Sequence, residues 1–254
     1  MSRASAPVPC SLAGRAVVIT RPAGTAAALA RQVRALGGEP LSLPGLSLRG
    51  AEDARGATAA LRAALRDEVL VFTSPAAVRF AARLAPLRTR ATVLAVGQGT
   101  ARALRRHGIA AIAPQRQDSE GLLDQPALQD LRGRRVALIG APGGRGLLRE
   151  QFAARGAQLR ELHVYRRVAP RLLRGHVDAV AALPRSARVL LSSAEALDNL
   201  RALLPPAAWS RLCAATAIAS SERLAAAARA AGFARVRIAA SAMAADLLAA
   251  AARR

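Results

Sequence analysis

The sequence predicts an α/β protein made of two similar parallel-sheet domains related by internal duplication. Short apolar, β-branched segments alternate with helical segments along the 254-residue chain, a pattern typical of parallel sheets covered on both faces. Three pairs of matching residues are each 119 residues apart: Val17 and Val136, Gly37 and Gly156, and Ser74 and Ser193. Three element pairs in one frame indicate a repeated α/β unit.

The chain opens with a β–α–β unit. Residues 15–20, RAVVIT, are predicted to form a strand because they are apolar and β-branched. A helix is expected within 21–38, where apolar residues have helical spacing and two glycines end the run. Residues 39–48 are extended and broken by Pro44 and Gly45, which indicates a linker.

The alternation then continues through the rest of the first repeat. A buried strand is expected at 69–74, and Pro75 opens a helix at its first turn. The further elements expected in this repeat are strands at 91–97 and 109–114 and helices at 98–108 and 118–131, the last with Ser119 as N-cap.

The second repeat shows the same pattern. Its expected elements are strands at 134–140, 157–165, 187–193, 212–220 and 233–240, and helices at 143–156, 194–204, 221–232 and 241–252. The linker-like segments 44–50 and 163–170 are also 119 residues apart. The chain can therefore leave one lobe at the first segment and return at the second, with a ligand cleft between two lobes.

Charge and composition limit the kinds of reaction and of binding partner that the chain can have. All 38 basic residues are arginine, so no lysine exists for a Schiff base, a pyridoxal-phosphate anchor or a P-loop. The formal net charge of +22 suggests a polyanionic partner, either nucleic acid or a small ligand with many carboxylates. Scattered arginines and an aromatic content of 2% weigh against stacked bases.

Metal sites and membrane segments are not expected. Cys10 and Cys213 match no metal spacing, and the three histidines do not cluster with them. Reduced thiols are expected, as in a cytoplasmic protein. The sequence also has no apolar run long enough for a signal peptide or a span of about 18–20 residues. A soluble cytoplasmic protein without nucleic-acid or membrane partners is the expectation.

Hydroxyl and glycine residues gather where predicted strands end and helices begin. The carboxyl ends of strands form the ligand crevice in open α/β sheets, and helix N-termini there present free N–H groups to anions. Helix capping explains a serine or threonine at such a position equally well. The residues in question are Thr20, Thr73, Ser74, 97–100, 140–146, Ser192, Ser193, Ser220 and Ser221.

The segment IGAPGGRG, residues 139–146, is rich in glycine but matches no nucleotide motif. It lacks the P-loop lysine, and its glycines do not fit GxGxxG. Gly144 and Arg145 are candidates for holding a substrate carboxylate, because a guanidinium forms bidentate bonds with that group. A plain strand-to-helix turn is the alternative. The sequence also shows no catalytic triad or paired carboxylates, so an enzyme of this kind would work by positioning its substrate.

An ordered set of motifs resembles the uroporphyrinogen-III synthase family from about residue 15 to 250. The motifs are VVITRPAG, VFTSPAAVRFAARL, LAVGQGTARALRRHGI, DSEGLL, VYRR and LLSSAEALDNL. The resemblance implies one domain of residues 1–46 and 167–254, a second of residues 47–166, and a two-stranded β connection. It also implies a cofactor-free reaction, in which hydroxymethylbilane loses water, its last pyrrole ring is inverted, and uroporphyrinogen III forms.

The resemblance also assigns candidate site residues. Tyr165, the only tyrosine, matches the family tyrosine proposed to aid departure of the hydroxyl. A tyrosine that only packs the linker is the alternative. Candidates for contacts with the eight carboxylates and the rest of the substrate are Arg21, Thr73, Ser74, Thr100, Gly144, Arg145, Ser192, Ser193, Ser220 and Ser221. Many relatives carry threonine or histidine at the Ser220–Ser221 position.

The leading hypothesis is therefore a monomeric, dehydrating, cyclising lyase of tetrapyrrole (heme) biosynthesis, with no cofactor and no metal. Transient contact with the preceding pathway enzyme is a further expectation. The alternative is a two-lobed, non-catalytic binding protein or regulator for a small polyanionic ligand. Fold alone does not separate the two hypotheses.

Overall fold

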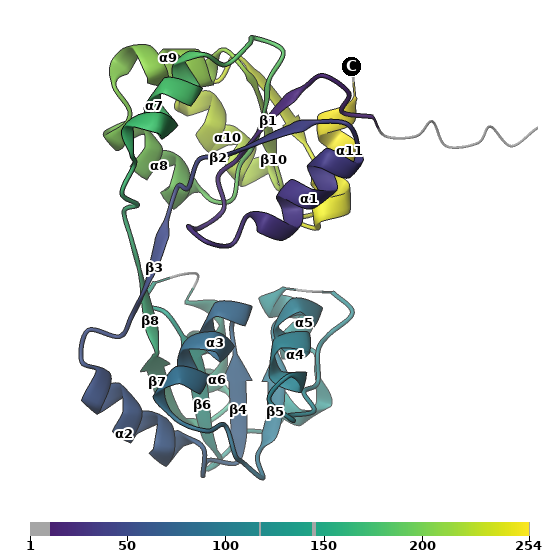
Figure 1. Cartoon of the computed structure of the whole chain (residues 1–254). Helices are drawn as coiled ribbons and strands as arrows, with labels where there is room; N and C mark the ends of the chain where they lie inside the picture. The colour runs from purple at the N-terminus through teal and green to yellow at the C-terminus, as the bar shows by residue number, and fades with distance from the viewer. Residues whose placement is uncertain (1–10, 117, 144–145, 254) are drawn as a thin grey trace, which may run out of the picture. The chain divides into compact units, whose positions relative to one another are not determined.

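The computed structural model describes residues 11–116, 118–143 and 146–253 (Figure 1). The chain divides into two compact units, one from Met1–Ser47 with Val168–Arg254 and the other from Leu48–Arg167. Each junction lies one residue later than the sequence predicts.

Unit 1 is built on a five-stranded parallel sheet of order β11-β10-β9-β1-β2. Its strands are β1 (Ala16–Ile19), β2 (Glu39–Ser42), β9 (Arg188–Leu190), β10 (Thr216–Ala219) and β11 (Arg235–Ile238). The central strands contain the buried, β-branched runs that the sequence predicts as parallel strands.

Helices cover both faces of this sheet, because successive side chains of a strand point to opposite faces. Helices α1 (Ala27–Ala35) and α11 (Ala244–Ala252) cover one side (Figure 1). Val17 and Ile19 pack on that side, whereas Val18 packs on the other. That other side is covered by α7 (Arg174–Ala181), α8 (Ala194–Leu203), α9 (Pro206–Cys213) and α10 (Glu222–Ala230). Unit 1 is thus a three-layer α/β domain.

Unit 2 has a four-stranded parallel sheet of order β5-β4-β6-β7. Its strands are β4 (Val69–Phe72), β5 (Thr92–Ala95), β6 (Arg135–Gly140) and β7 (Gln158–His163). One face packs against α2 (Ala54–Ala64), α3 (Pro75–Leu84) and α4 (Gln98–Arg105). The other packs against α5 (Ser119–Leu123), the 3₁₀ turn η1 (Pro126–Leu128) and α6 (Leu147–Ala154).

Two short strands lie where the chain passes from one unit to the other. β3 (Ser47–Gly50) pairs with β8 (Tyr165–Val168) in a two-stranded sheet. The fold class predicted from the sequence, two parallel-sheet α/β units with a two-stranded connection, is confirmed in these respects.

The two sheets are permuted copies of one another. At a spacing of 119 residues, β4 corresponds to β9, β6 to β1 and β7 to β2. These strands are neighbours in the same order in the two sheets, β4-β6-β7 in unit 2 and β9-β1-β2 in unit 1. Unit 2 uses one continuous segment for this arrangement, whereas unit 1 joins both chain ends.

Among the described residues, the helices α2 and α7 lie where the sequence predicts no element, and α9 overlaps a predicted element only at its last two residues. Helix α2 begins at the N-cap Asp53 and buries Leu61 and Ala64. The predicted strand 212–220 is too long at its start, since Leu212 and Cys213 still belong to α9.

Two further expectations are wrong in detail. The helix expected at 118–131 ends at Leu123 and resumes as η1 at Pro126, because proline cannot continue the α-helical hydrogen bonds. Its N-cap is Asp118, which accepts from the Gly121 N–H at 2.7 Å, and Ser119 is the first helical residue.

The strands expected at 109–114 and 157–165 also differ from the structure. The first is a single parallel bridge between Leu94 and Ile112. The second ends at His163, and Tyr165 starts β8 in the other sheet. None of the described helices is long and apolar enough to cross a membrane.

Candidate functional site

A pocket of about 410 Å³ lies at the carboxyl end of the unit 2 sheet. The ends of all four strands contribute to it, because parallel strands finish at the same edge. Its described hydroxyl-bearing lining residues are Thr73, Ser74, Ser119 and Tyr165, and its described ionisable side chains besides the phenol are Arg149, Glu161, His163 and Arg167. We call this the Tyr165 pocket.

Tyr165 is held at both ends of its side chain. Its ring stacks on Phe80, with centroids 5.3 Å apart and an interplanar angle of 13°. Its hydroxyl oxygen lies 3.2 Å from Ser74 Oγ, and either group can donate. The residue is only 6% exposed although its polar end borders the pocket. The phenol is therefore fixed in one orientation by packing and by a hydrogen bond.

Ser74 owes its position to the start of α3. It is the N-cap of that helix, and its Oγ accepts the Ala77 N–H at 3.1 Å. Pro75 at N1 has no N–H and a φ suited to the first turn, so the strand-to-helix turn forms locally. The same oxygen thus links a helix cap to the phenol.

Alternation along the chain brings a polar stripe to the pocket. Glu161, His163, Tyr165 and Arg167 all line it, while Leu162 and Val164 between them are buried in the core. Between Glu161 and His163 this period of two is that of extended backbone. Tyr165 departs from the alternation, because its ring packs on Phe80 in the same core cluster as Leu162 and Val164.

Thr73 forms the floor where β4 meets β6. Its Oγ1 donates to the carbonyl of Ile139 at 3.2 Å. A Cβ on Gly140 would lie 2.5 Å from this Oγ1, so the position requires glycine. The ends of β4 and β6 are therefore in close contact at the base of the pocket lining.

A second pocket, of about 320 Å³, lies at the carboxyl end of the unit 1 sheet. Arg21, Ser192 and Ser220 are among its described lining residues, and we call it the Arg21 pocket. Ser192 Oγ donates to the carbonyl of Thr20 at 2.9 Å. Ser192 and Thr20 stand 119 residues from Thr73 and Ile139, so the strand-end hydrogen bond is duplicated in the two units.

The other candidate residues lie outside the described lining of these two pockets. Ser193 and Ser221 are N-caps of α8 and α10, accepting the N–H groups of Ala196 at 3.1 Å and Leu224 at 3.3 Å. Thr100 is buried in the first turn of α4. Gly144 and Arg145 lie outside the described residues.

Sequence reasoning missed four charged or titratable neighbours of the phenol. They are Arg149, Glu161, His163 and Arg167. The alternation of polar and apolar residues at 161–167 was the available signal for three of them. Arg149, on α6, had no such signal, because the fold alone brings that helix to the pocket.

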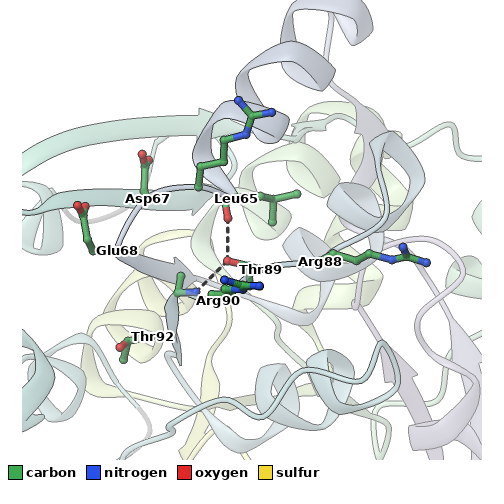
Figure 2. Close-up of a pocket in the computed structure, with 9 residues that line it drawn as sticks. Leu65, Asp67, Glu68, Arg88, Thr89, Arg90 and Thr92 are labelled. Atoms are coloured by element: carbon green, nitrogen blue, oxygen red, sulfur yellow. Dashed lines mark hydrogen bonds between the residues drawn. The ribbon is translucent and has the colours of Figure 1, made fainter.

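A larger hollow, of about 720 Å³, lies at the opposite end of the unit 2 sheet (Figure 2). It is bordered by the start of β4 and β5, where helix C-termini and strand amino ends meet. There Thr89 Oγ1 donates to the Leu65 carbonyl at 2.8 Å and accepts the Ala91 N–H at 3.0 Å. Ligands of open α/β sheets bind at the carboxyl ends of strands, so this hollow is the weaker candidate.

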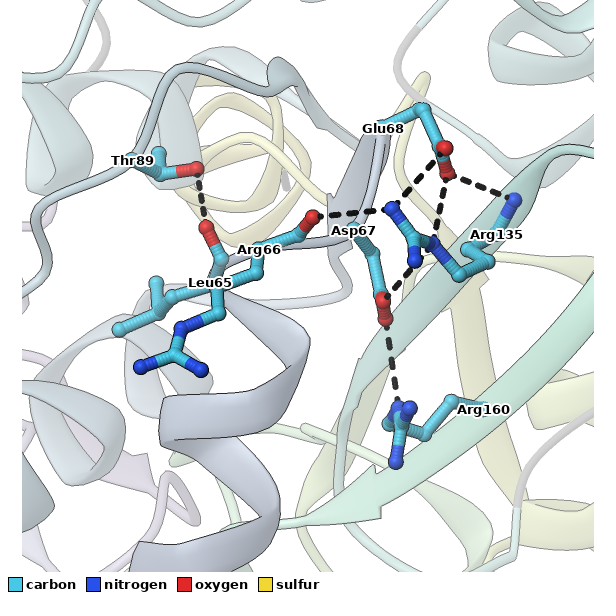
Figure 3. A network of polar contacts seen from close by, with 7 residues as sticks. All are labelled: Leu65, Arg66, Asp67, Glu68, Thr89, Arg135 and Arg160. Carbon is cyan, nitrogen blue, oxygen red and sulfur yellow. Dashed lines mark hydrogen bonds and ion pairs between the residues drawn. The ribbon is translucent and has the colours of Figure 1, made fainter.

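The acids near that hollow are already paired (Figure 3). The carboxylate of Asp67 is 4% exposed and lies 3.3 Å from Arg160 and 3.8 Å from Arg135. Arg135 donates its backbone N–H to Glu68 at 2.8 Å, and this bond is the main cause of the lowered pKa of the Glu68 carboxyl. These contacts join β4 to β6 and β7 and have a structural role.

The part of the chain that the structure describes contains no candidate metal site. No three His, Cys, Asp or Glu side chains gather there in a way that could hold an ion. Among the described residues, the two strand-end pockets offer hydroxyls, guanidinium groups, the phenol, one carboxylate and one imidazole.

The fold and the two strand-end pockets define an α/β protein of two duplicated units with polar and cationic groups at the carboxyl ends of its sheets. A family model described as "Uroporphyrinogen-III synthase HemD" matches residues 27–249. The uroporphyrinogen-III synthase of Salmonella typhimurium is 31% identical over 243 residues, which cover 88% of this chain and 94% of the relative. The chain belongs to the uroporphyrinogen-III synthase family, and the resemblance seen in its motifs is confirmed.

Other relatives agree with this assignment. The uroporphyrinogen-III synthase of Escherichia coli is 30% identical over 238 residues, covering 88% of this chain and 94% of the relative. A uroporphyrinogen-III synthetase structure from Helicobacter pylori has a TM-score of 0.59 at 16% identity, covering 92% of this chain and 96% of that one. A mutant uroporphyrinogen III synthase from Thermus thermophilus has a TM-score of 0.58 at 22% identity, with the same coverage. At these identities the structures establish the fold.

Proposed function

We propose that the Tyr165 pocket carries the chemistry of this chain, with Tyr165 as proton donor. The chain is a uroporphyrinogen-III synthase, a cofactor-independent lyase of heme biosynthesis that acts on hydroxymethylbilane. The reaction removes water, inverts the last pyrrole ring and closes the macrocycle. The observation that carries the proposal is the fixed phenol at the strand-end pocket.

The first step needs an acid at the hydroxymethyl oxygen. When the C–O bond breaks, its electron pair stays on oxygen, and the phenol proton turns the departing group into water. The pyrrole ring is left as an electrophile that the far end of the chain attacks. The proton later released from the closing pyrrole carbon balances the one given by Tyr165.

Ser74 supports this role in two ways. Its Oγ lies at hydrogen-bonding distance from the phenol, so it can stabilise charge on the phenol oxygen as the proton leaves. Its cap bond to Ala77 holds the serine in place without relying on the substrate. Little reorganisation is then needed when the proton moves.

Carboxylate binding is the second requirement, and cations border the pocket for it. Arg149 and Arg167 line the Tyr165 pocket, and Arg21 lines the pocket in unit 1. Guanidinium groups bind carboxylates through paired N–H donors. We propose Arg21, Thr73, Ser74, Ser192 and Ser220 as substrate-contacting residues on this basis. Thr100, Gly144, Arg145, Ser193 and Ser221 stay predictions from the family resemblance.

Separation of product isomers tests the proposal. The chain is incubated with hydroxymethylbilane, the products are oxidised, and the type I and type III uroporphyrins are separated and quantified. Type III is expected to dominate over type I, which forms by spontaneous closure in a heat-denatured control. Type I alone would remove the catalytic assignment and leave the non-catalytic binding protein as the explanation.

The remaining expectations concern the protein in its cell. We propose that it works as a cytoplasmic monomer and contacts the preceding pathway enzyme transiently. Sedimentation of the purified chain at micromolar concentration tests the first point, and a dimer would contradict it. Co-sedimentation with the enzyme that produces hydroxymethylbilane tests the second.

A further inference from the structure

Glu161 is the one acid among the described lining residues of the Tyr165 pocket. Its two carboxylate oxygens face two different basic side chains. Oε1 lies 4.0 Å from Arg149 Nη1, and Oε2 lies 4.0 Å from His163 Nε2. All three side chains line the pocket, and Glu161 is 36% exposed.

Both contacts of the Glu161 carboxylate are loose. At 4.0 Å they are at the outer limit of an ion pair and too long for hydrogen bonds. Within the described part of the chain, these are its only ion pairs. The carboxylate is therefore placed between two partners without being locked to either.

A negative group at this position is unexpected in a pocket for a polycarboxylate. It repels an incoming carboxylate and occupies the partners that the ligand would use. A ligand carboxylate that takes its place, however, restores the same contacts to Arg149 and His163. The exchange replaces one anion by another and leaves the Arg149 guanidinium paired.

We propose that Glu161 is an internal stand-in for a substrate carboxylate, and that Arg149 and His163 receive that carboxylate when Glu161 turns away. This inference rests on the proposed function and assigns three specificity-determining residues to the same pocket. A ligand with few carboxylates gains less from replacing Glu161 than one with many, so the exchange favours substrates with many carboxylates.

A competing role for Glu161 predicts the opposite change in ligand affinity when its charge is removed. A carboxylate in this pocket could accept the pyrrole N–H groups of the substrate, and its removal would then weaken binding. Glu161→Gln therefore separates the two roles, because it removes the charge and keeps the shape of the side chain.

Binding of benzenehexacarboxylate, a stable polycarboxylate probe, measures the effect without any turnover. Titration calorimetry is carried out on the full chain and on Glu161→Gln. The variant is expected to bind roughly 2- to 5-fold more tightly, the fold-change equivalent to one exposed ion pair. Equal or weaker binding would overturn the proposal.

A matched control removes the effect of overall charge. Glu39→Gln makes the same charge change in β2 of unit 1, and the affinity for the probe is expected to stay within about 1.5-fold. A double-mutant cycle adds Arg149→Gln to both backgrounds. Arg149→Gln should weaken binding more in the Glu161→Gln background than in the native one, because Arg149 is then free for the ligand. Equal losses would mean that Glu161 and Arg149 are not coupled.

The Michaelis constant for hydroxymethylbilane is the second readout. Glu161→Gln is expected to lower it by a similar factor while kcat changes less than about 2-fold. Failure to make type III isomer would remove the proposed function, but the calorimetric result would still decide the role of Glu161. Thermal melting confirms that each variant is folded before either measurement.

Discussion

The hydroxyl oxygens of Ser74 and Tyr165 lie 3.2 Å apart, although the residues are 91 positions apart in the chain. Ser74 Oγ also caps α3, and the ring of Tyr165 stacks on Phe80 of the same helix. One helix thus fixes the phenol through its cap and through its apolar face. Substitutions of Tyr165 and of Ser74 should therefore have different effects on turnover and on stability.

Replacing Tyr165 by phenylalanine should affect chemistry and little else. The ring keeps its stacking on Phe80, so the melting temperature should change little. Turnover of hydroxymethylbilane to the type III isomer should fall by about 10- to 100-fold, the lower part of what a general acid contributes. Unchanged turnover in a steady-state assay would remove Tyr165 from the chemistry.

Replacing Ser74 by alanine should lower both stability and turnover. Loss of the N-cap bond costs about 1 kcal/mol of unfolding free energy, measured by urea denaturation. Ser193→Ala, which removes the corresponding cap of α8, should cost a similar amount. Ser74→Ala should in addition reduce turnover by roughly 5-fold, the equivalent of one hydrogen bond. Ser74→Thr keeps a hydroxyl and a cap and should restore most of both losses.

Removal of the buried carboxylate of Asp67 should destabilise unit 2. Asp67→Ala leaves Arg135 and Arg160 without their shared partner and is expected to lower the unfolding free energy by about 1 to 3 kcal/mol. Asp130→Ala breaks an exposed pair with Arg132 and should have a much smaller effect. Chemical denaturation of the two variants tests the difference. Equal losses would show that burial of Asp67 adds nothing to the strength of its ion pairs.

Stability should decrease at alkaline pH because of Cys213. Burial raises the pKa of its thiol from 9.0 to about 11, and nearby Arg201 only partly offsets this. Between these values the unfolded thiol loses its proton while the folded one keeps it, so rising pH favours unfolding. Below pH 9 the contribution is fully present.

The comparison with Cys213→Ala isolates this effect. Between pH 8 and pH 11 the native chain should lose about 1 to 2 kcal/mol of unfolding free energy relative to the variant, a value below the full shift because the folded thiol itself begins to lose its proton near pH 11. Urea denaturation at several pH values gives the difference. A constant difference across this range would contradict the assigned thiol burial.

Much of the architecture can be read from local patterns. The buried β-branched runs and the recurring 119-residue spacing predict two parallel-sheet units, and the order of corresponding strands in the two sheets bears this out. Helices α2, α7 and α9 were missed although α2 and α9 bury two and three residues, as the predicted helices α1 and α8 do. In the segment expected to form a strand at 109–114, Ile112 forms only a parallel bridge with Leu94.

The sequence by itself determined the α/β class, the duplication, the family and the phenol as a candidate. Each of these depends on residue type and spacing along the chain. Only the tertiary structure decided that Ser74 meets Tyr165 and that Arg149 and His163 flank Glu161. The physical reason is that parallel strands end at one edge regardless of their separation in sequence, so sheet order and helix packing choose which side chains become neighbours.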